Sequence, residues 1–284
     1  MTNGALTASM NHFFITFAYD RLHSAICEQV HIALFGTIAT TTKHNVNATI
    51  MIQTLSITTR PGAVLAIALV LACTTAAAQQ RPRQTTAQRM AAAGYVDIRD
   101  VDPSIKVSLM YARADNFTGR VLYGDLREAY LHPLAAAALK KAQARLKELR
   151  PDLCLKVYDA ARPMAIQQKM WDAVKDTGHS FYVSNPKNGG GLHNYGLAVD
   201  LTLCRADGDT IPMGTKIDNM TSVSHIDREE ELVAKGKMSR EALANRRLLR
   251  QVMKYAGWKP LRTEWWHFNL RSRAEAKKNF KVIK

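Results

Sequence analysis

The pattern of apolar and polar positions predicts a folded domain between residues 94 and 284. Short runs in which apolar residues alternate or cluster indicate strands, and longer Ala- and Leu-rich runs that begin near Pro or Ser indicate helices. The expected strands cover 95–98, 105–109, 153–159, 197–203 and 264–270, and the expected helices cover 134–149, 163–176 and 239–256. We therefore expect a single α+β domain in which helices pack on an antiparallel sheet.

Residues 210–240 form a long connection within this domain. The segment is mostly polar and is interrupted by Pro212, Gly214 and Gly236, which predicts a loop. Long ordered loops often form the wall or lid of a functional site. His225 is therefore a candidate cleft residue, although a loop histidine is ordinarily solvated.

Residues 51–78 have the features of a secretory signal. Arg60 precedes an apolar run at 63–72, and small residues lead to an Ala-x-Ala cleavage site that ends at Ala78. The apolar run is too short to span a bilayer, so we expect cleavage after Ala78 and export to the periplasm or cell envelope. Because such signals stand at the start of a protein, residues 1–50 are expected to be upstream sequence translated in error. A genuine extension is the alternative.

Two short features adjoin this signal. Cys73 follows Val70-Leu71-Ala72, which loosely resembles a lipoprotein box and leaves lipid anchoring as an alternative. Residues 79–93 are polar and Ala-rich and contain Arg81-Pro82-Arg83, a composition that predicts a tether between the cleavage site and the domain.

The charge of the chain indicates an acidic partner. The formal net charge is +15, and only five of the charged residues precede the cleavage site. Such an excess is common in nucleic-acid-binding proteins, but no basic-aromatic motif of a known nucleic-acid module occurs, and export argues against that partner. An acidic polymer of the cell wall is the expected partner class. No stable protein partner is implied.

Cys154 and Cys204 are the only cysteines after the signal, and both lie in predicted strands. Buried free thiols are the ordinary interpretation of such positions. An oxidising compartment would permit a bridge, but the spacing alone does not bring the two sulfurs together.

Two segments concentrate side chains that bind metals. His193 is followed seven residues later by Asp200, and Glu264 is followed three residues later by His267. Two imidazoles and one carboxylate are a common catalytic zinc set, which leaves a fourth position for water. Gly196 can give the first segment the turn it needs. Glu264 and His267 would face opposite sides of a regular strand, so a bend or bulge must aim both at one site.

The joint occurrence and order of six short motifs resemble the D-alanyl-D-alanine dipeptidases of the vancomycin-resistance type, a branch of the peptidoglycan-directed zinc peptidases. The likeness covers nearly all of residues 94–270. The motifs are Asp115-Asn-Phe-Thr-Gly119, Asp159-Ala-Ala-Arg-Pro163, His193-x-x-Gly-x-Ala-x-Asp200, Pro212-Met-Gly214, Asn245-Arg-Arg247 and Glu264-Trp-Trp-His267.

The resemblance implies one zinc ion per chain in a cleft of the domain, held by His193, Asp200 and His267. It also implies that Glu264 acts as general base and then general acid, and that Arg162 stabilises the developing oxyanion. The expected reaction is hydrolysis of D-Ala-D-Ala to D-alanine. These residue types suit the chemistry, because zinc acidifies water and a nearby carboxylate can move the proton.

Two positions depart from the family pattern. Gly191 stands where the family usually carries Ser, two residues before the first zinc histidine, and Ala161 replaces a tyrosine often found before the motif arginine. The first departure leaves the substrate open between the dipeptide and longer wall peptides, as cut by a D,D- or L,D-carboxypeptidase or an endopeptidase. A noncatalytic wall-binding module is the alternative from another class, although it would need neither Glu264 nor Arg162.

Overall fold

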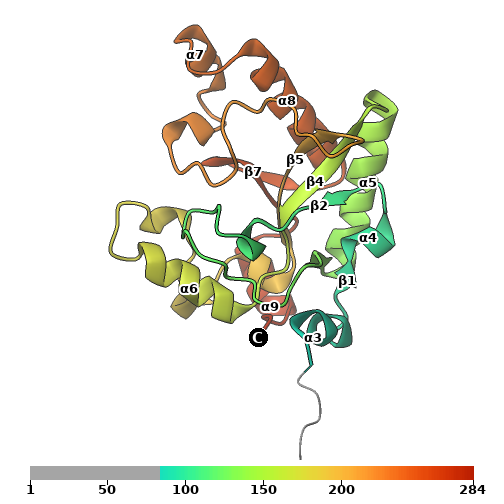
Figure 1. Cartoon of the computed structure of the whole chain (residues 1–284), viewed down its shortest axis with the longest axis vertical. Coiled ribbons are helices and arrows are strands. Elements are labelled where there is room, and N and C mark those ends of the chain that lie inside the picture. The colour runs from blue at the N-terminus through green and yellow to red at the C-terminus, as the bar shows by residue number, and fades with distance from the viewer. Residues whose placement is uncertain (1–83) are drawn as a thin grey trace, which may run out of the picture. The chain divides into compact units, whose positions relative to one another are not determined.

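The computed structural model describes residues 84–284, so the predicted upstream segment, secretory signal and Cys73 lie outside the described residues. A five-stranded sheet with the order β2-β4-β5-β7-β6 forms the centre of this part of the chain (Figure 1). Its strands are β2 (Lys106–Val107), β4 (Leu153–Asp159), β5 (Ala198–Arg205), β7 (Glu264–Asn269) and β6 (Lys259–Leu261).

The sheet is mixed, which corrects the expectation of a wholly antiparallel sheet. Strands β4, β5, β7 and β6 pair antiparallel, but β2 pairs parallel to β4. Parallel neighbours need a long crossover connection. The chain provides one between β2 and β4, and it contains the helix α5 (Pro133–Leu149).

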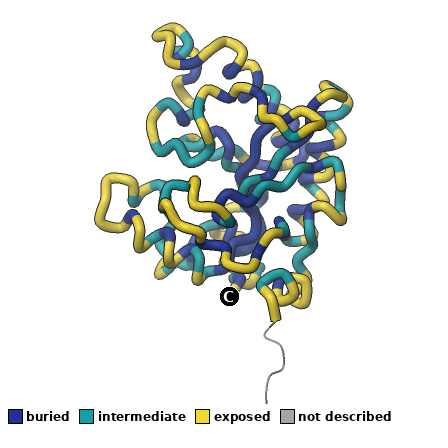
Figure 2. The backbone as a smooth tube through the Cα atoms, viewed as in Figure 1, coloured by how far each residue is buried: buried dark blue, intermediate teal, exposed yellow. Residues whose placement is uncertain are grey.

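Two long helices cover one face of the sheet, as their periodicity predicts. In α5, Pro133 occupies the first turn, and buried Leu139 and Leu146 lie on the face that packs inward. The helix α8 (Arg240–Tyr255) begins where the Ser239 hydroxyl accepts a hydrogen bond from the Ala242 amide at 3.0 Å. The two helices contact each other and the sheet. The central strands are among the most buried parts of the backbone (Figure 2).

The long connection at 210–240 is ordered by contacts with α8. Asn245 Nδ2 donates to the Pro212 carbonyl at 2.8 Å, and Arg246 Nε donates to the Met213 carbonyl at 2.7 Å. The segment also contains a 3-10 turn, η5 (Ser222–Ser224), and a short helix, α7 (Glu229–Ala234), which the polar pattern does not predict. Two family motifs thus serve to attach this loop to the domain.

Several short elements differ from the sequence expectation. The segment expected to be a tether contains the helix α3 (Thr86–Ala92). This helix begins with a capping box formed by Thr85 and Gln88, and its buried Met90 packs against the core. The helix α9 (Arg273–Asn279) also begins with a capping box. The remaining elements are β1 (Val96–Asp97), α4 (Ile98–Val101), η1 (Met110–Ala112), β3 (Tyr130–Leu131), α6 (Met164–Val174), η2 (Ser180–Tyr182), η3 (Pro186–Asn188) and η4 (Leu192–Tyr195).

Cys154 and Cys204 lie directly opposite each other on β4 and β5. Both are buried free thiols, as the ordinary interpretation of their positions predicts. Among residues 84–284, no helix combines the length and the apolar character needed to cross a membrane.

Candidate active site

Three neighbouring strands place polar side chains in one row across the sheet. Asp159 on β4 pairs with Asp200 on β5, and Asp200 pairs with His267 on β7. A register shift between Val157 and Asp159 brings Asp159 into this row. All three lie within or at the end of mostly apolar strands, so the packing of the sheet holds their backbones rigidly.

His193 reaches the same row from the turn that precedes β5. It lies in η4, which ends at Gly196 with a φ of 66°. A side chain at residue 196 would put its Cβ 2.6 Å from a ring carbon of Tyr95 and 2.9 Å from the backbone nitrogen of His132. The turn therefore needs glycine both for its left-handed backbone and for space, as the sequence predicts.

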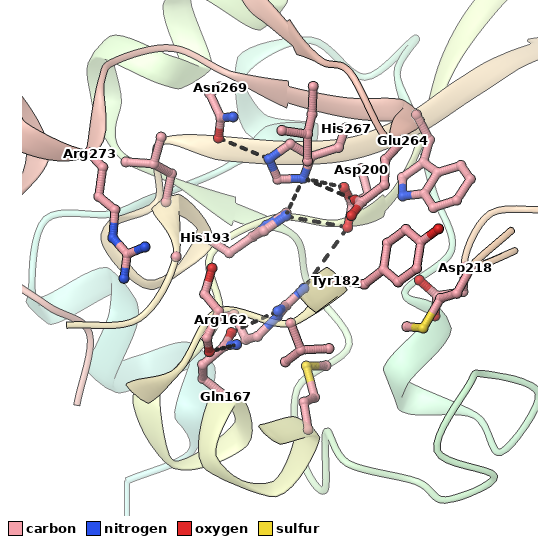
Figure 3. A pocket seen from close by; sticks show the side chains of 18 of the residues that line it. Arg162, Gln167, Tyr182, His193, Asp200, Asp218, Glu264, His267, Asn269 and Arg273 are labelled. Carbon is pink, nitrogen blue, oxygen red and sulfur yellow. Dashed lines mark hydrogen bonds and ion pairs between the residues drawn. The ribbon is translucent and has the colours of Figure 1, made fainter. Parts of the chain in front are cut away.

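The structure brings the three expected metal ligands together (Figure 3). One donor atom from each of His193, Asp200 and His267 lies within 4.8 Å of the others. His193 Nε2 is 3.2 Å from His267 Nδ1 and 3.3 Å from Asp200 Oδ2, and His267 Nδ1 is 2.9 Å from Asp200 Oδ1. His193 and Asp200 are buried, and His267 is nearly so.

The outward nitrogen of each imidazole is already occupied by a protein oxygen. His193 Nδ1 lies 2.7 Å from the Ala160 carbonyl, and His267 Nε2 lies 2.9 Å from Asn269 Oδ1. Each oxygen only accepts, so each of these nitrogens carries the proton. In the tautomers that these contacts select, the inward nitrogens present lone pairs to each other and to the Asp200 carboxylate. Such an arrangement is repulsive unless a cation lies between the donors, and this partner pattern is typical of metal-binding histidines.

Glu264 lies beside this cluster without belonging to it. Its Oε2 is 3.9 Å from His267 Nδ1. The pairing of β7 with β6 shifts between Pro260 and Leu261, so that Leu261 faces Glu264 while Pro260 faces Phe268. This irregularity is the bulge that the three-residue spacing requires. Burial raises the pKa of Glu264 to about 7, with Asp200 and Asp218 adding to the rise and His267 opposing it.

Arg162 is held at the edge of the cluster by a buried network. Its Nε and Nη2 both donate to Asp159 Oδ2, and its Nη1 donates to Gln167 Oε1 at 2.8 Å. Its Nη2 is 3.9 Å from Asp200 Oδ2. Burial alone would lower the pKa of Arg162, but Asp159 and the neighbouring groups raise it well above its ordinary value. The guanidinium is therefore a permanent positive charge next to the proposed ligands.

A cavity of about 340 Å³ opens onto all five of these side chains, at the small end of the range for small-molecule sites. Asp218 from the long loop and Arg273 from α9 also line it, and Figure 3 shows them on opposite sides of the histidines. Arg271 and Lys259 add further positive charge to the lining. The cavity therefore offers the Asp218 carboxyl group on one side of the histidines and the Arg273 guanidinium on the other.

Asp218 is the site residue that sequence reasoning does not identify. Its φ of 62° is the only positive value among the non-glycine residues that the structure describes, and both of its carboxylate oxygens accept from the Tyr111 hydroxyl, at 3.0 and 3.1 Å. Burial, and next the charge of Asp200, raise its pKa to about 7. Strained backbone and a perturbed carboxyl in a cleft are both features of functional residues. The only signal in the sequence is the expectation that this loop walls a cleft.

Other expected residues lie at the margin of the cavity. His225 does not line it, but His225 Nε2 is 3.3 Å from the hydroxyl of Tyr182, which does. Trp265 and Trp266 are both buried, and only Trp266 contributes to the lining. Gly191 lines the cavity, whereas Ala161 is buried outside it.

Comparison with known proteins identifies the same family that the sequence motifs resemble. A model of the peptidase M15 family, described as D-ala-D-ala dipeptidase, matches residues 91–284. The chain is similar to a D-alanyl-D-alanine dipeptidase of Escherichia coli, with 35% identity over 62% of this chain and 83% of the relative. It is also similar to a protein of the same name from Enterococcus faecium, with 30% identity over 63% of this chain and 92% of the relative. A third relative of that name, from Streptomyces coelicolor, has 31% identity over 59% of this chain and 86% of the relative.

Proposed function

Because the chain belongs to the D-ala-D-ala dipeptidase family and is therefore a metallopeptidase, we propose that it hydrolyses D-Ala-D-Ala to D-alanine with one zinc ion. The observation that carries this proposal is the convergence of three possible ligand atoms, one each from His193, Asp200 and His267, beside a carboxyl group and a fixed guanidinium. A structural metal site has no need of the last two groups.

His193 Nε2, Asp200 and His267 Nδ1 would hold the ion. Two imidazoles and a carboxylate suit zinc, and the Ala160 carbonyl and Asn269 amide orient the rings for it. When bound, zinc would supply a Lewis acid that acidifies a water molecule and polarises the peptide carbonyl.

Glu264 would move the proton. Its carboxylate lies next to the proposed ligand His267 without belonging to the ligand set, so it can accept a proton from the attacking water, and its carboxylic acid can return that proton to the leaving nitrogen. Arg162 would stabilise negative charge that develops on the carbonyl oxygen, because Asp159 and Gln167 fix its position before the reaction begins.

The distribution of charge along the cavity favours a small zwitterion. The Asp218 carboxylate can pair with the ammonium group of a dipeptide, and the basic side of the lining, with Arg273, can receive its carboxylate. A longer wall peptide has no ammonium group at this position and would place an amide against Asp218 instead. Charge pairing at both ends therefore supports the dipeptide over the carboxypeptidase alternative.

We further propose that the enzyme acts outside the cytoplasm in cell-wall peptide metabolism. The support comes from the signal-like pattern of residues 51–78 and from the excess of positive charge in the domain, which suits an acidic wall polymer.

The test is release of D-alanine by the zinc-loaded full chain from D-Ala-D-Ala and, in parallel, from a wall pentapeptide that ends in D-Ala-D-Ala. We expect cleavage of the dipeptide and little cleavage of the pentapeptide. The control is Glu264→Gln, which should bind zinc as the parent does but lose about 10²- to 10⁴-fold in kcat. Cleavage of the pentapeptide in preference to the dipeptide would assign the enzyme to the carboxypeptidases, and full activity of Glu264→Gln would overturn the mechanism.

A further inference from the structure

Ser184 occupies the space that a side chain at residue 191 would fill. A Cβ built on Gly191 would lie 3.0 Å from Ser184 Oγ and 3.3 Å from Ser184 Cβ. Gly191 has an extended backbone, with φ −102° and ψ −177°, so its conformation does not require glycine. A side chain at residue 191 would therefore press on Ser184, which would have to shift to admit it.

Ser184 is connected to the catalytic groups through Gln167. The buried amide of Gln167 donates from Nε2 to the Ser184 carbonyl at 2.8 Å and accepts from Arg162 Nη1 at 2.8 Å. One side chain thus fixes both the backbone of Ser184 and the guanidinium of Arg162. The position of Ser184 relative to the site is set by buried hydrogen bonds rather than by a free loop.

The hydroxyl of Ser184 is available to a ligand. Ser184 lines the cavity together with Arg162, Gly191 and His193. Its Oγ forms no hydrogen bond with any residue of the range 84–284, and it is not among the buried polar atoms without partners. A hydroxyl that belongs to a lining residue with an anchored backbone, and that has no partner within the described residues, can both donate to and accept from a bound peptide.

We propose that Ser184 is a specificity-determining residue whose hydroxyl forms a hydrogen bond with the backbone of the bound dipeptide. The hydroxyl lies where the side chain of residue 191 would lie if that residue were not glycine. This inference rests on the proposed function for the identity of the ligand. The departure at Gly191 then relocates a hydroxyl to another segment of the chain and does not remove it from the cavity.

The experiment compares D-Ala-D-Ala kinetics of the zinc-loaded full chain with those of Ser184→Ala. Loss of one substrate hydrogen bond should raise KM about tenfold and change kcat less. Ser180→Ala is the matched control, because Ser180 lies in the same loop, is also half-buried and does not line the cavity. It should leave both constants unchanged.

An exchange of the two positions gives the sharper test. Gly191→Ser alone forces its Cβ against Ser184 and should weaken substrate binding. The double variant with Ser184→Gly and Gly191→Ser vacates both contacting atoms and returns a hydroxyl to the same space, so KM should fall to within about threefold of the parent. A KM that stays at the level of Gly191→Ser would overturn the proposal, as would a parental KM in Ser184→Ala.

A binding measurement separates this inference from the proposed function. The Kd of D-Ala-D-Ala is measured by calorimetry on zinc-loaded Glu264→Gln, with and without Ser184→Ala. If the parent fails to hydrolyse the dipeptide but Ser184→Ala still weakens its binding about tenfold, the proposed function is wrong and the role of Ser184 stands. An unchanged Kd overturns the role of Ser184 whatever the activity of the parent.

Discussion

Asp218→Asn should stabilise the metal-free protein above neutral pH while it weakens substrate binding. The carboxyl lies in the cavity with a pKa of about 7, and burial is the main cause of the rise. Between pH 4 and 7 the folded protein therefore keeps a proton that the unfolded chain releases. The free energy of unfolding consequently falls as the pH rises through this range and levels off above pH 7.

The expected size follows from that pKa. A rise from the ordinary 3.8 to about 7 corresponds to an upper bound of about 4 kcal/mol. Asp218 is only half-buried and lines the cavity, so we discount the bound for screening by solvent and expect roughly half of it, about 2 kcal/mol. For a domain of this size the melting temperature of Asp218→Asn should exceed that of the parent by about 5 °C at pH 8 and match it at pH 4. Asparagine tolerates the left-handed backbone at this position, which isolates the effect of charge.

The assay is thermal unfolding by circular dichroism from pH 4 to pH 8 in the presence of a chelator, because a bound dication would lower the pKa of a nearby carboxyl. Asp209→Asn changes an exposed aspartate near the same loop and should give no difference from the parent that depends on pH. A melting temperature of Asp218→Asn below that of the parent at pH 8, or a difference of equal size at pH 4 and pH 8, would refute the reasoning. In the zinc-loaded protein the same variant should raise KM for D-Ala-D-Ala at least tenfold, because the ammonium group loses its counter-charge.

Two further predictions concern the residues around the proposed ligands. Asn269→Ala removes the acceptor that orients His267 and should weaken zinc binding about 10- to 100-fold, measured by competition with a chromophoric chelator. Asn188→Ala is the control at an exposed asparagine and should leave the zinc affinity unchanged. An unaltered zinc affinity of Asn269→Ala would show that His267 needs no such partner. Asp159→Asn leaves the buried guanidinium of Arg162 without its main counter-charge and should lower the free energy of unfolding in urea by about 3 kcal/mol, whereas Asp152→Asn at an exposed ion pair should leave it unchanged. Equal effects of these two aspartate variants would contradict the network around Arg162.

The sequence by itself determined the elements whose stability depends on nearby residues. The helices over 134–149 and 239–256 and the strand over 153–159 follow from apolar periodicity, Pro133 and the Ser239 cap, which are local signals. The need for a turn at Gly196 and for a bulge between Glu264 and His267 also follows from spacing and the geometry of a strand. The motifs that resemble the family supplied the proposed ligands, Glu264 and Arg162, and the structure places these residues around one cavity.

The tertiary structure decided the features that depend on contacts between distant segments. The parallel pairing of β2 with β4 follows from a crossover between them, and neither strand encodes that pairing in its own pattern. Asp218 becomes a site residue only because α8 attaches its loop to the domain and because the hydroxyl of Tyr111, more than a hundred positions earlier, donates a hydrogen bond to its carboxylate. The Ser184 side chain fills the space next to Gly191 although the two residues lie seven positions apart in the sequence. Periodicity reports which face of an element is buried, but it does not report which other segment covers that face, because the packing energy arises only when both are in place.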